Sequence, residues 1–64
     1  MAKLEYTNID YEIKHKDTMI VYYWENNIKY SLCEISECGK MTDKARMDLI
    51  VDVLENDLDY EVER

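Results

Sequence analysis

The stretch TMIVYYWENNIKYSLCEI, residues 18–35, decides the fold because it has the pattern of two β-strands joined by a tight turn. Asn26 and Asn27 tolerate the positive φ values that a two-residue type I′ hairpin turn requires. β-Branched and aromatic residues are frequent in 18–25 and 28–35, as is typical of strands. We therefore predict a β-hairpin whose loop is Asn26-Asn27.

A further strand is predicted immediately before this hairpin. From Ile9 to Ile13 apolar and acidic residues alternate, which is the period of a half-buried strand. The polar run KHKD at 14–17 is expected to form the turn into the hairpin. The result is an antiparallel meander of three strands.

The turn and the alternation together predict which side chains share a sheet face. The expected cross-strand pairs of the hairpin are Tyr23 with Tyr30, Val21 with Leu32 and Ile20 with Cys33. One face is then expected to hold Ile9, Tyr11, Ile13, Ile20, Tyr22, Trp24, Cys33 and Ile35. The other is expected to hold Met19, Val21, Tyr23, Ile28, Tyr30 and Leu32. A slip of one residue would exchange the faces.

After Gly39 the periodicity becomes helical, over about residues 42–58. Thr42 or Asp43 can cap the first free N–H groups of the helix. The apolar face is expected to hold Met47, Ile50, Val51, Leu54 and Leu58, and Leu49 and Val53 widen it. Residues 59–64 alternate again and are expected to add a short edge strand or to fray.

These elements predict an α+β fold in one small domain, 1–64: a three-stranded meander followed by an amphipathic helix packed on it. One helix covers one sheet face, and a chain of 64 residues has a marginal core. A homodimer is therefore expected to cover the second face, the alternative being solitary aromatic side chains with wet hydroxyls. The expected partner or dimer contacts are apolar or aromatic: Tyr23, Trp24, Tyr30, Leu49 and Val53.

Composition argues against several classes of protein. The N-terminal sequence lacks the apolar core of a signal peptide, and no apolar run approaches the length of a membrane span. With only two cysteines, a reducing cytoplasm and free thiols are expected. Cys33, Cys38 and the single histidine, His15, are too few for a zinc site, and no nucleophile or phosphate loop is recognisable. We expect no enzyme activity, no metal and no cofactor.

Charge is the most informative feature of the sequence. Through Met47 there are eight acidic and seven basic residues, whereas from Asp48 onward seven acidic residues accompany Arg64 alone. This excess disfavours direct binding of nucleic acid, which depends on Lys and Arg. Asp48, Asp52, Glu55 and Asp59 recur at helical spacing and form an acidic stripe. The expected site for a basic protein partner consists of acidic residues: Asp48, Asp52, Glu55, Asp59, Glu61 and Glu63. The plainer interpretation is a solvated helix face that maintains solubility.

In size, charge and composition the chain resembles, as a class, the small acidic inhibitors that phages direct against host nucleic-acid enzymes. Uracil-DNA glycosylase inhibitors and several anti-CRISPR proteins belong to that class. The resemblance implies a phage-type protein in the host cytoplasm that inhibits a nucleic-acid-handling enzyme by charge mimicry of DNA or RNA, and it carries over no residues. The alternative is a structural or regulatory adaptor that homodimerises and binds through its aromatic sheet face.

Overall fold

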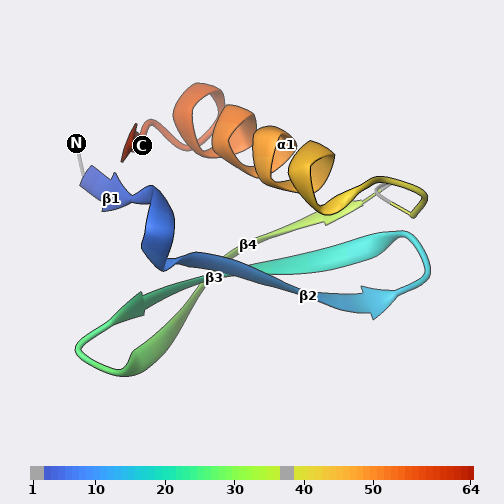
Figure 1. The fold of residues 1–64 in the computed structure, drawn as a ribbon, viewed down its shortest axis with the longest axis horizontal. Helices are drawn as coiled ribbons and strands as arrows, with labels where there is room; N and C mark the ends of the chain where they lie inside the picture. The colour runs from blue at the N-terminus through green and yellow to red at the C-terminus, as the bar shows by residue number, and fades with distance from the viewer. Residues whose placement is uncertain (1–2, 37–38) are drawn as a thin grey trace.

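The computed structural model describes residues 3–36 and 39–64, and its architecture confirms the α+β class. Strands β2, β3 and β4 form the antiparallel meander, and helix α1 lies across one side of it (Figure 1). A second, separate pair of strands joins the two ends of the chain. In chain order the elements are β1 Lys3–Glu5, the 3-10 turn η1 Tyr6–Asn8, β2 Ile9–His15, β3 Thr18–Glu25, β4 Ile28–Ser36, α1 Asp43–Asn56 and β5 Glu61–Glu63.

The β3–β4 hairpin closes through Asn26 and Asn27, whose φ angles are 54° and 65°. Tyr23 lies opposite Tyr30, as predicted. Further along, a β-bulge adds Leu32 to β4, so Val21 pairs with Cys33. The predicted pairs of Val21 with Leu32 and Ile20 with Cys33 are therefore wrong, because each assumed a regular ladder.

The turn between β2 and β3 also differs from the prediction. It is a two-residue turn at Lys16 and Asp17 with a register shift beside Lys14, in place of a four-residue loop. Ile13 consequently pairs with Met19 and Ile9 with Tyr23. A shift of one residue moves an entire strand to the opposite face. The apolar residues of β2 thus share their face with Met19, Val21 and Tyr23, and the predicted grouping with Ile20, Tyr22 and Trp24 is wrong.

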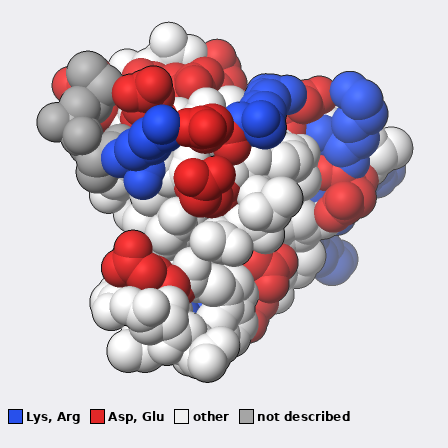
Figure 2. All heavy atoms as spheres, turned by 60° about the vertical axis from the view of Figure 1, so that its left-hand side comes forward, with Lys and Arg blue, Asp and Glu red and all other residues white. Residues whose placement is uncertain are grey.

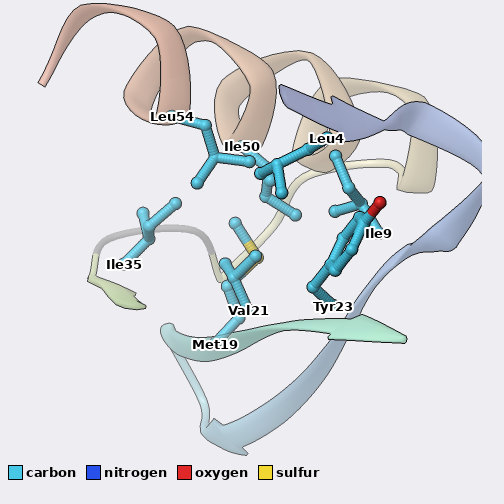
Figure 3. Packing of buried hydrophobic residues seen from close by; sticks show 8 residues of the cluster. All are labelled: Leu4, Ile9, Met19, Val21, Tyr23, Ile35, Ile50 and Leu54. Carbon is cyan, nitrogen blue, oxygen red and sulfur yellow. The ribbon is translucent and has the colours of Figure 1, made fainter. Parts of the chain in front are cut away.

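The hydrophobic core lies between α1 and this face of the meander (Figure 3). Met19, Val21, Ile50 and Leu54 are fully buried. Five further apolar side chains are also buried: Leu4, Ile9, Tyr23, Ile35 and Val51. The helix therefore faces the sheet with Ile50, Val51 and Leu54, as its periodicity predicted, while Leu58 stays 42% exposed beyond the helix end.

Local signals fix both ends of α1. The Thr42 hydroxyl accepts a hydrogen bond from the Ala45 N–H at 3.1 Å, which satisfies one of the free donors of the first turn. At the other end, the N–H groups of Leu58 and Tyr60 donate to the Val53 and Leu54 carbonyls, at 3.3 and 2.9 Å. The helix ends at Asn56, two residues before the predicted limit.

The ends of the chain form the second sheet. β5 pairs with β1 in parallel, with Lys3 opposite Glu61, Leu4 opposite Val62 and Glu5 opposite Glu63. A C-terminal strand was predicted, but it joins β1 and not the edge of the meander (Figure 1). The three residues of β1 were not predicted as a separate strand, since such a short segment shows no periodicity.

The segment before α1 runs close to the β2–β3 turn. A Cβ atom on Gly39 would lie 3.0 Å from the Lys16 carbonyl oxygen, so only glycine fits without a shift. No helix among residues 3–36 and 39–64 is long and apolar enough to cross a membrane.

Candidate functional site

Carboxylates gather where α1 ends and β5 begins. Asp52 and Glu55 project from the last turns of α1, Asp57 and Asp59 follow in the connection, and Glu61 opens β5. All five residues are exposed. Within the described part of the chain, none of them forms an ion pair. We call these five residues the terminal acidic surface.

Two of the six acidic residues predicted to bind a partner are compensated by neighbouring bases. Asp48 lies 3.1 Å from the Lys44 ammonium and 3.8 Å from the Arg64 guanidinium. Glu63 forms an ion pair with Lys3 across the β1–β5 sheet. From Asp48 onward, the carboxylates without an ion pair in the described structure therefore lie at the end of α1, in the connection to β5 and at the start of β5, closer to the C-terminus than the predicted stripe.

Asp59 departs most from the predicted stripe. The helix has already ended, and Asp59 adopts the left-handed conformation with φ of 58°. The stripe as a helical row thus consists of Asp48, Asp52 and Glu55 only. Asp59 still belongs to the terminal acidic surface, because the connection turns back beside the end of the helix.

The local electrostatics favour a cationic ligand over an anionic one. No basic residue lies in the last turn of α1, so the negative end of the helix dipole adds to the field of the carboxylates. Lys3, at the margin of this region, has its pKa raised mainly by its hydrogen bond to Glu63. Figure 2 shows Asp and Glu across the upper part of this side of the molecule, with Lys and Arg interleaved, and a mostly uncharged surface below that holds two further acidic patches.

The sheet face away from α1 has a cover of its own. Ile20 and Tyr22 lie on it and are only half exposed. The Lys29 ammonium forms an ion pair with Glu12 and lies 4.0 Å from the centre of the Tyr22 ring. A second ion pair, of Lys14 with Glu34 at 3.4 Å, links the outer strands again.

These two ion pairs reduce the need for a partner to cover the sheet face away from α1. Both connect β2 with β4 across the central strand, so the aliphatic stems of the lysines shield apolar surface while their charges stay in water. A partner subunit is therefore not needed merely to cover Ile20 and Tyr22. The homodimer remains a prediction.

The predicted aromatic and apolar contact residues lie in different environments. Tyr23 is only 9% exposed, and its hydroxyl accepts a hydrogen bond from the Glu5 N–H at 3.0 Å, so its predicted place on an uncovered face is wrong. Trp24 and Tyr30 are 40% and 47% exposed near the tip of the β3–β4 hairpin. Leu49 and Val53 are half-buried and pack against the core cluster.

A polar link between the sheet and the start of α1 was not predicted. The Tyr11 hydroxyl donates to the Asp43 carboxylate at 2.5 Å, and this hydrogen bond is the main reason why the pKa of Tyr11 is raised. The Arg46 guanidinium lies 5.8 Å from the Tyr11 ring centre and donates to the Gly39 carbonyl. Tyr11 is distant in sequence from Asp43 and Arg46, so no spacing could have indicated the link, whose role is to attach α1 to β2.

Other residues offer little for catalysis or metal binding. Among residues 3–36 and 39–64, no group of three or more His, Cys, Asp and Glu side chains could hold a metal ion. Burial raises the pKa of the Cys33 thiol, which disfavours the reactive thiolate. Cys38 lies outside the described residues. An open depression beside the β2–β3 turn is lined by Lys16, Asp17, Gly39 and Lys40.

Comparison with known proteins gives no family: no family model, no curated protein and no solved structure matches this chain.

Proposed function

We propose that this protein is a non-enzymatic binding module whose terminal acidic surface occupies a basic surface of another protein. The observation that carries the proposal is the set of five exposed carboxylates, Asp52, Glu55, Asp57, Asp59 and Glu61, which form no ion pair in the described structure. Other acids of the fold are paired with bases, as in the pairs of Lys29 with Glu12 and Lys14 with Glu34.

Placing these carboxylates together without bases costs free energy in the unbound protein, which is the physical reason for the proposal. Like charges at i, i+3 and i, i+4 repel, and acids at a helix C-terminus oppose its dipole, each costing about 0.3 kcal/mol or more. A cationic surface brought against them removes both penalties, and long-range attraction speeds the encounter. The partner class that fits is a protein with a basic groove, such as a nucleic-acid-handling enzyme, and the outcome is inhibition by charge mimicry of DNA or RNA.

The experiment is capture of partners from a bacterial lysate on the immobilised protein, followed by elution with a salt gradient. Under the proposal, captured proteins are basic, elute as salt rises, and are displaced by an excess of duplex DNA. The variant D52N/E55Q should weaken their capture about tenfold, as the loss of two charges facing a basic groove implies. The matched control D10N/E25Q removes the same charge from the meander and should leave capture unchanged.

An adaptor that binds through exposed aromatic residues is the second candidate. Ile28 and Tyr30, 53% and 47% exposed, lie on one face of the hairpin near its tip, and Trp24, 40% exposed, lies on the other face, so this tip can anchor a partner. The same capture experiment separates the two functions. If W24A/Y30A abolishes capture while D52N/E55Q and added DNA have no effect, charge mimicry is rejected and the adaptor function is supported.

A further inference from the structure

The β1–β5 sheet is a separable part of the fold. It shares no strand with the meander, so its two strands can part without breaking a backbone hydrogen bond of β2, β3 or β4. Each strand has only three residues. β5 follows α1 through the short connection 57–60 and pairs through its backbone with β1 alone.

The residues that contact β5 and Arg64 form a slot that accepts one type of sequence. Leu4, 5% exposed, lies opposite Val62, which packs against the core cluster. Lys3 lies opposite Glu61 and forms an ion pair with Glu63. After the strand, the Arg64 guanidinium lies 3.8 Å from Asp48 and 5.4 Å from the centre of the Tyr6 ring. An extended segment with the sequence acid-apolar-acid-Arg fits this slot, and β5 of any copy of the chain has it.

The connection that folds β5 back is under conformational strain. Asp59 has φ of 58°, in the left-handed region, where aspartate is more frequent than most residues but still less stable than glycine. If Asp59 becomes extended, the cost of its left-handed conformation is removed, the Tyr60 N–H gives up its hydrogen bond to the Leu54 carbonyl, and β5 points away from its own β1. Short hinge loops under strain are a recognised cause of exchange of an element between identical chains.

We propose that β5 exchanges between two copies of this chain, each inserting its last strand beside β1 of the other to form a strand-exchanged homodimer. Every contact of β5 is kept, but with the second copy, and both hinges relax. The equilibrium therefore depends on hinge strain and on concentration, with the dimer forming as concentration approaches the effective value of a tethered strand, about millimolar. This inference is independent of the proposed function.

The direction in which the dimer fraction changes with salt concentration distinguishes strand exchange from association through ion pairs. Each copy carries a net charge of −7, so two copies repel each other at low ionic strength. The ion pairs of β5 are the same in both states and cancel. Added salt screens only the repulsion, with a Debye length of about 8 Å at 0.15 M. The dimer fraction should therefore rise with salt, whereas capture of a basic partner should fall.

Complementary charge reversals provide the decisive test. K3E places an acid against the acids of its own β5, and E61K/E63K places bases against its own Lys3, so each variant alone should be monomeric. Unfolded and refolded together at about millimolar concentration, they should form a 1:1 heterodimer in native mass spectrometry, since both exchanged slots are then matched. A mixture that stays monomeric overturns the proposal.

Variants of the hinge residue Asp59 provide an independent test, because they leave the contacts between β5 and β1 unchanged. D59G removes the strain of positive φ and should weaken dimerisation of the full chain about tenfold, because both hinges lose their gain on opening. D59V disfavours the closed hinge and should strengthen dimerisation. Sedimentation equilibrium measures both. Equal dimerisation of D59G and D59V, or a dimer that dissociates as salt is added, contradicts strand exchange.

Discussion

The hydroxyl of Tyr23 provides a precise test of the core, because the hydrogen bond it accepts joins the meander to β1. In Y23F the ring stays buried in the core beside Ile9, its cross-strand partner. Only the acceptor for the Glu5 N–H is lost. Leaving a part-buried donor without its partner costs about 1 kcal/mol. For a domain of this size that loss lowers the melting temperature by about 4–8 °C.

Tyr30 supplies the matched control. It lies directly opposite Tyr23 in the hairpin, yet it is 47% exposed, so Y30F should change stability by less than about 0.5 kcal/mol. Thermal unfolding followed by circular dichroism compares the two variants under identical conditions. The phenylalanine change is preferred to alanine, because truncating a buried aromatic costs about 3–5 kcal/mol and would remove most of the stability of so short a chain.

The amide of Glu5 reports on the same bond directly. In Y23F its hydrogen exchange should accelerate, while exchange of amides within β3 and β4 changes only with global stability. If Y23F and Y30F melt at the same temperature and Glu5 exchange is unaffected, Tyr23 does not hold β1. The core described above would then be incorrect at this position.

Two further predictions concern the helix start and the buried thiol. T42A should lower the free energy of unfolding by about 1 kcal/mol because the Ala45 N–H loses its acceptor, and T42S, which keeps the oxygen, should restore most of it in urea titrations. In a C38S background, alkylation of Cys33 by iodoacetamide at pH 8 should be slower in the folded than in the urea-unfolded protein, because burial raises its pKa. Since the folded state holds the thiol proton more tightly, stability should fall as pH rises through the thiol range, about 8.5 and above; equal alkylation rates would contradict this.

The sequence predicted those parts of the fold that depend on local chemistry. Asn26 and Asn27 form the expected turn, Thr42 caps the helix, and Ile50, Val51 and Leu54 face the core. Each of these features follows from a few neighbouring residues, whose φ preferences or periodicity dominate their conformation.

The sheet faces could not be predicted because they depend on single-residue irregularities. The shift beside Lys14 and the bulge at Leu32 each move part of a strand to the opposite face, and neither leaves a signal in an alternating pattern. This error placed Tyr23 on an uncovered face when it belongs to the core. Hydrophobicity alone did not distinguish the two arrangements, because apolar residues occupy both sides of β3.

The candidate site was predicted in its general position but not in its members. Charge excess after Asp48 can be counted in the sequence, and it correctly located the exposed acids Asp52, Glu55 and Glu61. Only the pair of Lys44 with Asp48 could be expected from sequence spacing, because Lys3 and Arg64 reach Glu63 and Asp48 only after β1 and β5 have paired. Pairing between distant residues therefore helps to decide which carboxylates have no ion pair.

The parallel alignment of Lys3–Glu5 with Glu61–Glu63 also determines how this unit can be carried within a larger polypeptide. Because the chain enters and leaves at neighbouring points, the whole fold can be spliced into a surface loop of a host protein as a cassette, with little distortion of either. Displayed in this way, the hairpin tip at Asn26 and Asn27 stands at a distance from the splice (Figure 1). The same geometry permits new ends to be opened at that tip while the original ones are joined.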